Sequence, residues 1–286
     1  MKKITVFTPT YNSGSKLPVL YKSLVDQSCQ DFIWLIVDDG STDETETIVN
    51  KWLSDGEIEI EYIKQENKGK SFAHNVGVEN TFTELFVCVD SDDYLDKFAI
   101  ECVLKHWETR IDGDIGILAK RSVTCQKKEL DNQSIHTTLR DASKKYGIYG
   151  DTMLVYKTNI IQKYKFPSFK NEKFVPENYL YDLLDRDGTL YYLNKVLYYG
   201  SYCDDGYTRN MAKTIKHNST GYLAYITQRI SLDHSLFDRY TDLIRYVAIN
   251  LARRDYRFLF KSGHPLLCFF AIPTGFALYW SRYKDV

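Results

Sequence analysis

The stretch FVCVDSDDYL, residues 86 to 95, joins an apolar run to three closely spaced carboxylates. The run from Phe86 to Val89 predicts a buried strand, because it is short, continuous and apolar. Asp90, Asp92 and Asp93 follow it at once. Like charges at this spacing raise one another's pKa unless positive charge lies nearby. The stretch therefore predicts a strand that ends beside a positively charged partner.

Strands and helices alternate through the first hundred residues. The predicted strands cover residues 4–10, 32–39, 57–65 and 84–90, and helical patterns follow them at 16–28, 42–53, 69–80 and 96–107. The second helix is expected to take Thr42 or Asp43 as its N-cap. Because strands that alternate with helices are joined by right-handed crossovers, the pattern predicts an α/β fold with a mostly parallel central sheet flanked by helices.

Three of these strands end in polar residues, at Thr8–Asn12, Asp38–Ser41 and Asp90–Asp93. Any one such end is typical of a turn or a helix cap, since Asp, Asn, Gly and Ser are ordinary turn residues. Ligands of open α/β sheets bind outside the carboxyl ends of the strands, and the predicted topology puts all three ends on that edge. Together they favour a binding site.

Asp90 and Asp92 suit a hard divalent cation, Mg²⁺ or Mn²⁺. Mg²⁺ usually takes only one or two protein carboxylates and completes its shell with water and substrate phosphates. Such a cation would neutralise the charge that builds on a departing diphosphate. The predicted positive partner is therefore a metal ion that binds together with a nucleotide diphosphate.

A base and a ribose fit the two neighbouring strand ends. Asp38 and Asp39 are too acidic to face phosphate, and their carboxylates suit a base N–H or a ribose hydroxyl. The other side of a base is expected to be closed by Thr10, Tyr11 and Asn12.

Bulk composition excludes a nucleic-acid partner. The chain has 286 residues with 37 Lys and Arg against 38 Asp and Glu, so no basic field is available to hold a phosphate backbone. The 23 Tyr are assigned mainly to core packing. Six scattered Cys without a CxxC pair predict reduced thiols, and the first residues carry no signal-peptide pattern. A cytoplasmic location is expected.

Beyond residue 110 the alternation becomes irregular. Strands are predicted at 114–120, 151–157 and within 189–202, a loop-rich insertion at 120–150, and a helix at 175–188 with Pro176 in its first turn. From about residue 210 onward the patterns are helical, and residues 236–254 carry apolar side chains at i, i+3 and i+4 spacing.

Four motifs in this order carry a resemblance to a known family: TPTYNS, VDDGSTD, QENKGKSFAHNVGV and VDSDDY, which begin at residues 8, 37, 65 and 89. Together they resemble the family 2 glycosyltransferases, with a GT-A fold and a DxD motif. The resemblance implies a GT-A domain over residues 1–210, with a nucleotide-binding half at 1–110 and an acceptor half at 111–210. Residues 211–286 would then form a helical extension.

The resemblance implies an enzyme. It would be metal-dependent, mostly inverting, and would move a sugar from a nucleotide-sugar donor, most often a uridine one, to a glycan or lipid-linked acceptor in envelope or capsule assembly. Pro9, Tyr11 and Asp39 correspond to family positions around the base, Asp90 to one near the ribose, and Asp92 to the metal ligand. The family stretch beside the donor is matched by Asn67, Gly69, Lys70 and Asn75.

An inverting transfer needs a carboxylate base on the acceptor side. The family often has Glu-Asp at the start of a helix, and here Glu177 is followed by Asn178. A helix N-terminus favours an ionised carboxylate, which suits a base and equally a cap. Glu177 is the preferred base, with Glu172 and Asp182 as alternatives. His217 is more typical of a surface residue than of a metal ligand.

Other readings of the aspartates fit less well. A haloacid-dehalogenase-like phosphatase expects its D-x-D after the first strand, and a nucleotidylyltransferase expects a Gly-rich loop there, where TPTYNSGSK has a single Gly. A non-catalytic nucleotide-sugar-binding module is the alternative from another functional class. It would keep Asp90 and Asp92 but lack a competent base.

The last segment, residues 265–280, carries no charge and lies between basic residues. These are Arg257, Lys261, Arg282 and Lys284. The segment is shorter than the ~20 residues that span a bilayer, and Pro273 and Gly275 interrupt it. One hypothesis is a buried helix pair that closes the core. The other is an in-plane anchor that gives residues 263–286 a peripheral contact with the inner face of the cytoplasmic membrane.

Overall fold

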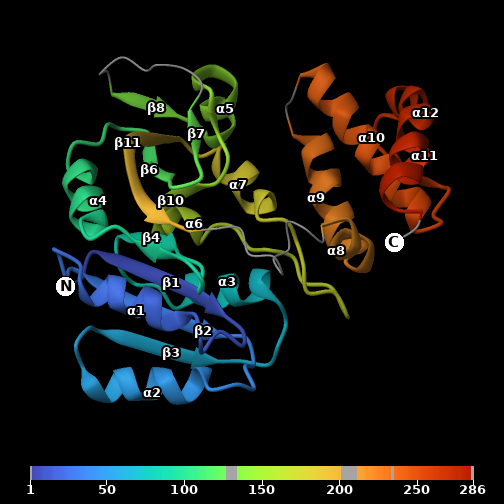
Figure 1. Cartoon of the computed structure of the whole chain (residues 1–286). Helices are drawn as coiled ribbons and strands as arrows, with labels where there is room; N and C mark the ends of the chain where they lie inside the picture. Colours follow the sequence, from blue (N-terminus) through green and yellow to red (C-terminus); the bar gives the residue numbers. More distant parts are fainter. Residues whose placement is uncertain (1, 127–133, 201–210, 233–234, 285–286) are drawn as a thin grey trace. The chain divides into compact units, whose positions relative to one another are not determined.

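The computed structural model describes residues 2–126, 134–200, 211–232 and 235–284 (Figure 1). The chain divides into two compact units. The first comprises Met1–Lys165 and Leu180–Ser201, and the second comprises Phe166–Tyr179 and Tyr202–Val286. This division differs from the expected one, because residues 166–179 group with the C-terminal helices.

The first unit is built on a nine-stranded sheet with the order β3-β2-β1-β4-β10-β6-β11-β5, in which β8 also pairs with β11. Its strands are β1 (Ile4–Thr10), β2 (Phe32–Asp38), β3 (Ile60–Lys64), β4 (Leu85–Cys88), β5 (Tyr94–Leu95), β6 (Asp114–Arg121), β8 (Ile135–Thr137), β10 (Thr152–Lys157) and β11 (Thr189–Tyr199). The sheet is continuously parallel from β3 through β4, whereas β10 runs antiparallel to both of its neighbours. The predicted α/β class is confirmed.

Helices cover this sheet. They are α1 (Leu17–Val25), α2 (Thr45–Asp55), α3 (Lys70–Glu79), α4 (Ala99–Trp107), α5 (Leu139–Tyr146) and α6 (Thr158–Ile161), and α7 (Asn178–Leu184) crosses from the second unit into the first. The strands and helices expected in the first hundred residues are present, with ends that differ by a few residues. The expected N-cap of α2 is wrong, because Glu44 occupies that position. Asp43 instead accepts hydrogen bonds from the Thr45 N–H at 3.1 Å and hydroxyl at 2.6 Å.

The segment 120–150 contains more regular structure than expected. β7 (Cys125–Gln126) pairs with β9 (Ile148–Tyr149), and α5 precedes β9. The sequence hides α5 because this helix is short and buries only Ala142. The helix predicted at 175–188 is shorter, since α7 begins two residues after Pro176 and ends at Leu184.

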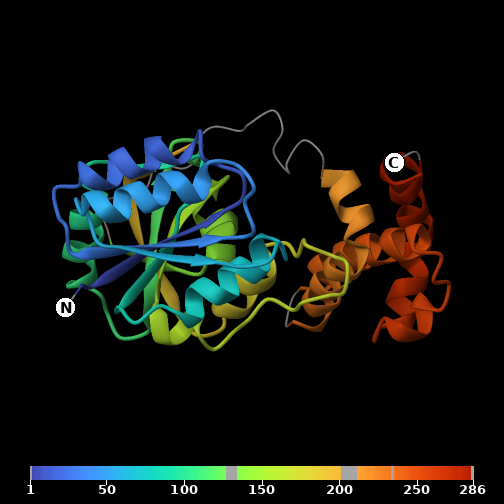
Figure 2. The ribbon, with the colours of Figure 1, turned by 90° about the horizontal axis from the view of Figure 1, so that it is seen from below.

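The two faces of the sheet bury alternate residues of the same strands. Val6 and Val87 belong to the core that includes side chains of α1, α2 and α4. Phe7 and Phe86 point to the opposite face, where His74 of α3 lies edge-on to their rings at 5.6 and 5.5 Å. Gly77 permits this approach, because a Cβ there would lie 2.3 Å from the Phe7 ring. Figure 2 shows α1 and α2 on one face and α3 on the other.

The second unit is helical, as expected from about residue 210. Its helices are α8 (Met211–His217), α9 (Ser219–Ser231), α10 (Leu236–Ala252), α11 (Phe258–Lys261) and α12 (Pro265–Arg282). The amphipathic pattern predicted at 236–254 is α10, which packs against α9 and α12. The expected helix pair at 265–280 is wrong, because α12 runs through Pro273 as one helix. Within the described ranges, no helix is long and apolar enough to cross a membrane.

Candidate active site

The ends of β1, β2 and β4 meet at one edge of the sheet, as predicted. Thr10 lies opposite Asp38, and Phe7 lies opposite Cys88. The backbone N–H of Val89 donates to Phe7 O at 2.8 Å, which continues the pairing past the last residue of β4. The register of the three strands therefore brings their polar ends together.

Hydrogen bonds then join the three loops that follow these strands. The Asn12 N–H donates to Ser41 Oγ at 2.9 Å, and Asn12 Oδ1 accepts from the Thr42 N–H at 2.8 Å. Asn12 has a φ of +49°, a left-handed conformation that Asn adopts more readily than most residues. The hydroxyls of Ser13 and Ser91 lie 3.0 Å apart and connect the first loop to the third. The three loops form one connected surface.

Asp38 is fully buried and holds the loop that follows β2. Its Oδ1 accepts from the Ser41 N–H at 2.7 Å, and its Oδ2 accepts from the Tyr62 hydroxyl at 2.6 Å. The predicted contact of Asp38 with a base or ribose stays a prediction, and any such contact must compete with these bonds.

Asp39 holds the loop that leads into α3. Its Oδ1 accepts from the Lys68 N–H at 2.8 Å and from Gln65 Nε2 at 2.7 Å, while its Oδ2 accepts from the Gly69 N–H at 2.7 Å. Gly40 has a φ of +82°, and a Cβ there would lie 3.0 Å from the backbone N of Asn67. The loop carrying Asn67 and Lys70 is thus fixed against the end of β2.

Asp90, Asp92 and Asp93 each lie beside a basic side chain of the protein. Lys70 Nζ lies 2.6 Å from Asp90 Oδ1, and Arg121 Nη2 lies 2.6 Å from Asp93 Oδ2. Lys16 Nζ lies 3.8 Å from Asp92 Oδ2. The predicted positive partner was a metal ion, and the structure shows that three basic residues already provide positive charge here.

The ionisation of Asp90 is set by burial and by Lys70. Burial favours the neutral acid, but the charge and hydrogen bond of Lys70, helped by Arg121, outweigh it and hold the pKa of Asp90 below its usual range. Asp90 is therefore a carboxylate at neutral pH, and its side chain remains one-third exposed, at 33%.

Asp93 lies in a buried network with Arg121 and Tyr198. The Tyr198 hydroxyl donates to Asp93 Oδ2 at 2.7 Å and accepts from the Asp90 N–H at 3.0 Å. The Arg121 guanidinium lies over the Tyr198 ring, 4.7 Å from its centre. Burial raises the pKa of Asp93 to about 6, against the opposing effects of Tyr198 and Arg121. Tyr198 thereby fastens both ends of the turn from Asp90 to Asp93.

The residues of this edge fit a metal ion held by Asp92 rather than by a cage of several protein ligands. No group of three or more His, Cys, Asp or Glu that could hold a metal occurs among the residues that the structure describes. Mg²⁺ needs no such cage, because substrate phosphates and water complete its shell around one or two carboxylates. Asp92 is about one-third exposed, at 31%, and its contact with Lys16 is long. Its oxygens suit a hard cation that arrives with a diphosphate.

The remaining predicted nucleotide contacts lie on β1 and the loop after it. Pro9 and Thr10 are buried, whereas Tyr11 is half exposed. The Thr10 hydroxyl is buried and has no hydrogen-bond partner within the described ranges. A ligand atom at this edge of the sheet would supply that missing partner.

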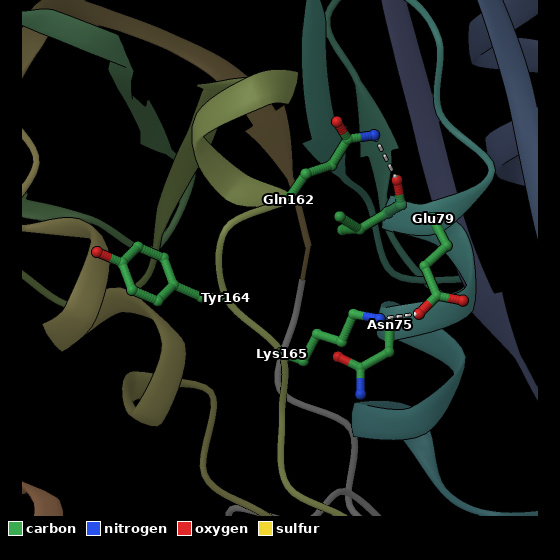
Figure 3. A pocket seen from close by; sticks show the side chains of 6 residues that line it. Asn75, Glu79, Gln162, Tyr164 and Lys165 are labelled. Carbon is green, nitrogen blue, oxygen red and sulfur yellow. Dashed lines mark hydrogen bonds and ion pairs between the residues drawn. The ribbon is translucent and has the colours of Figure 1, made fainter.

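Asn75, predicted beside the donor, lines a separate cavity of about 250 Å³ between α3 and the chain after α6 (Figure 3). Its other lining residues are Val78, Glu79, Gln162, Tyr164 and Lys165. Lys165 Nζ binds Glu79 Oε1 at 2.6 Å, and Gln162 Nε2 donates to Val78 O at 3.1 Å. None of the three aspartates lines this cavity, so the structure does not bring Asn75 together with them there.

The candidate bases lie in different surroundings. Glu177 is exposed, directly precedes α7 and belongs to the second unit, while Asp182 is half-buried within α7 in the first. The Glu172 carboxylate accepts from the N–H groups of Thr220 at 3.0 Å and Gly221 at 2.8 Å, in the first turn of α9. Glu172 is thus a helix cap. His217 ends α8, with its Nδ1 2.8 Å from Lys213 O.

Sequence reasoning missed Lys16, Arg121 and Tyr198. Arg121 and Tyr198 lie 28 and 105 residues from Asp93 in sequence. The one available signal was the basic residue at the end of the apolar strand DIGILAKR. Nothing in local spacing indicates that it faces the carboxylates.

The sequence matches a known protein family. The family model described as glycosyl transferase family 2 matches residues 5–165, more than half of the chain. The chain belongs to this family. The matched range contains all three aspartates, Lys70 and Arg121, and it leaves out Glu177 and the second unit.

Relatives of the chain include enzymes of bacterial wall polymers. It is 28% identical over 192 residues to the poly(ribitol-phosphate) beta-N-acetylglucosaminyltransferase TarP of Staphylococcus aureus, over 64% of this chain and 57% of that protein. It is 33% identical over 106 residues to the teichoic acid poly(glycerol phosphate) polymerase of Staphylococcus epidermidis, over 37% of this chain but only 15% of that protein. The chain thus spans a minor part of several of its relatives.

Solved structures share the fold. S. aureus TarS 1-349 in complex with UDP-GlcNAc aligns with a TM-score of 0.63 at 18% identity, over 94% of this chain and 79% of that one. A mannosyltransferase of Pyrobaculum calidifontis in complex with GDP-Man and Mn²⁺ aligns with a TM-score of 0.59 at 15% identity, over 96% and 73% of the two chains. At these identities the likeness supports the GT-A fold.

Proposed function

We propose that this protein is a metal-dependent, inverting glycosyltransferase that moves a hexosyl or N-acetylhexosaminyl group from a UDP-sugar to a hydroxyl group. The observation that carries the proposal is the joined edge of β1, β2 and β4, where Asp90 and Asp92 lie beside Lys70 and Lys16. Family membership and the UDP-GlcNAc complex of a structural relative support a nucleotide-sugar donor.

In this proposal the donor lies across the three loops. The base and ribose contact the ends of β1 and β2 and the loop before α3, and the residues assigned to them are Pro9, Thr10, Tyr11, Asn12, Asp38, Asp39, Asn67, Lys70 and Asp90. Asp38 and Asp39 act largely by holding their loops in place, since their oxygens already accept protein hydrogen bonds. Asp92 would hold Mn²⁺ or Mg²⁺, which supplies positive charge to the leaving diphosphate.

Glu177 is the proposed base. Its carboxylate would take the proton from the attacking acceptor hydroxyl as the new glycosidic bond forms and the bond to the diphosphate breaks. Glu177 directly precedes α7, where the helix dipole favours the ionised form. Glu172 fits this role less well, because its oxygens accept two backbone N–H groups of α9.

The acceptor proposed is a growing glycan or a lipid-linked one in envelope or capsule assembly. This proposal draws on relatives named for poly(ribitol-phosphate) and teichoic acid. We expect the reaction in the cytoplasm, consistent with four described cysteines that form no disulfide.

A donor screen with two variants tests the proposal. Thermal shifts with a panel of nucleotide sugars and Mn²⁺ should identify a stabilising uridine donor. Asp92→Asn should abolish most of the metal dependence of UDP binding in calorimetry, because an amide is a poorer ligand for a hard cation. Equal UDP affinity in EDTA and in Mn²⁺ would contradict the metal site.

Glu177→Gln separates the enzyme from the alternative, a non-catalytic nucleotide-sugar-binding module. The variant should bind donor normally and lose about 100-fold or more in turnover, since only the transition state uses the proton transfer. Near-normal turnover of this variant, with loss in Asp182→Asn, would move the base to Asp182. If the wild type and all variants bind donor but none transfers or hydrolyses it, the non-catalytic binding module is favoured.

A further inference from the structure

Helix α12 of the second unit is apolar on all sides, and one of its faces packs against the other described helices of this unit. Cys268, Ala271 and Gly275 are buried on that face. Gly275 lies close to α10, where a Cβ would approach within 2.6 Å of Val247. An all-apolar helix is expected to be buried all round, so the opposite face requires a partner.

The opposite face carries an apolar stripe of five large side chains, each more than half exposed. They are Leu266 (73%), Phe269 (58%), Phe270 (60%), Phe276 (51%) and Trp280 (54%). At about 100° per residue, the five positions fall within an arc of about 120° on one side of the helix. From Leu266 to Trp280 the stripe is roughly 21 Å long at 1.5 Å per residue.

Basic residues lie at both ends of this stripe. Residues 253–286 contain six basic and two acidic side chains: Arg253, Arg254, Arg257, Lys261, Arg282 and Lys284 against Asp255 and Asp285. Asp255 lies 2.7 Å from Lys261 and 3.9 Å from Arg257, so one acidic residue faces two basic ones before α12 and positive charge remains in excess there. Lys284 Nζ lies over the Trp280 ring, so positive charge adjoins the end of the stripe.

This charge distribution favours an anionic surface over a second copy of the chain. If two copies paired along α12, parallel or antiparallel, a basic end of one helix would face a basic end of the other. Like charges brought together at an interface oppose association. A lipid surface with anionic headgroups instead attracts both ends while its acyl boundary takes up the apolar stripe.

We propose that α12 docks in the plane of an anionic lipid bilayer, with the apolar stripe at the acyl boundary and the basic ends among the headgroups. The buried face of α12 stays packed on α10, so docking needs no unfolding of the second unit. The inference rests on the second unit alone and is independent of the proposed sugar transfer. It joins the two earlier hypotheses, because one face of the helix is core and the other is the anchor.

Removing α12 is a poor test, because its inner face is part of the hydrophobic core. Substitutions on the exposed face leave that core intact. The test variant is Phe270→Gln with Phe276→Gln, and the matched control is Phe82→Gln, since Phe82 is 78% exposed but lies in the first unit. A second variant, Arg282→Gln with Lys284→Gln, tests the charge.

Co-sedimentation uses the full chain with vesicles of phosphatidylcholine, with and without phosphatidylglycerol. The wild type and Phe82→Gln should bind the anionic vesicles. The stripe variant, Phe270→Gln with Phe276→Gln, should bind them at least about tenfold more weakly. The charge variant should bind anionic vesicles more weakly, and high salt should weaken the binding of the wild type in the same way. Equal binding of the stripe variant and wild type, or no binding by either, would overturn the proposal. So would a wild-type dimer in light scattering that the stripe variant converts to monomer without any vesicle binding.

Tryptophan fluorescence of the wild-type chain gives an independent readout of docking. Of the four tryptophans, Trp34, Trp52 and Trp107 are buried and Trp280 is exposed. Anionic vesicles should shift the Trp280 emission to the blue, and brominated acyl chains should quench it. Trp280→Phe should remove both effects. Unchanged emission on addition of vesicles would refute the in-plane docking.

Discussion

Tyr198→Phe tests whether the buried network behind the aspartates controls donor binding. The substitution keeps the ring of Tyr198 and removes a hydroxyl that donates to Asp93 at 2.7 Å and accepts from the Asp90 N–H at 3.0 Å. Both ends of the turn from Asp90 to Asp93 then lose a fixed contact. On the proposed function, the same turn carries the metal ligand Asp92.

The magnitude follows from the two lost hydrogen bonds. A hydrogen bond to a charged carboxylate contributes about 1.5–3 kcal/mol, and a buried N–H left without a partner costs about 1–3 kcal/mol. The lower values sum to about 2.5 kcal/mol, of which water recovers a part because Asp90 is partly exposed. A loss of about 2 kcal/mol corresponds to an affinity decrease of up to about 30-fold, if the displaced turn cannot bind donor.

Calorimetry of UDP binding in Mn²⁺ measures this effect, with Tyr199→Phe as the matched control. Tyr199 is the next residue of β11, and its ring stacks on Tyr94 with ring centres 5.2 Å apart. Loss of the Tyr198 donor also raises the pKa of Asp93 above about 6, so the acid limb of UDP binding should move to higher pH. Affinity within about twofold of the wild type, or an equal loss in Tyr199→Phe, would refute the reasoning.

Three further outcomes are expected. Burial lowers the pKa of His74 to about 3, against 6.5 for an ordinary imidazole. Between pH 6.5 and pH 3 the unfolded chain therefore binds a proton that the folded chain does not, and the free energy of unfolding falls as the pH drops. Denaturation at pH 7 and 5 should show a loss of about 2 kcal/mol that His74→Gln lacks, and equal losses would contradict it. Lys70→Met should raise the pKa of Asp90 and move the acid limb of donor binding upward, and an unmoved limb would show that Lys70 does not set this pKa. Glu172→Gln should lower the melting temperature while turnover stays normal; loss of turnover at unchanged stability would make Glu172 the base.

Local patterns in the sequence were enough to predict the fold and the shared edge of the sheet. Phe86, Val87 and Val89 of the apolar run are buried as expected, and Cys88 is partly buried. The strand ends near Thr10, Asp38 and Asp90 meet because consecutive parallel crossovers place them at one edge. These features depend on residues near one another in the chain, so composition and period reveal them.

Features that depend on distant residues escaped prediction. Arg121 reaches Asp93 because β11 pairs with β6 through several register shifts that bring Tyr198 opposite Arg121. Glu172 looked like a candidate base because nothing in its neighbourhood showed that α9, which begins at Ser219, would present backbone N–H groups to it. The contacts that Asp38 and Asp39 make with their own loops also escaped prediction, because their partners Tyr62, Gln65, Lys68 and Gly69 lie 24 to 30 residues away.

The charge balance at the strand ends bears on how a metal would be recruited. Three carboxylates, Asp90, Asp92 and Asp93, lie beside three basic side chains, Lys70, Lys16 and Arg121, so the turn from Asp90 to Asp93 is close to neutral without a metal. A neutral turn attracts a divalent cation weakly, because burying an extra charge requires a partner of opposite sign. A diphosphate supplies that partner, and Lys16, whose contact is the longest of the three, has the least to lose by moving from Asp92 toward phosphate. Metal and nucleotide are therefore expected to bind together rather than in sequence.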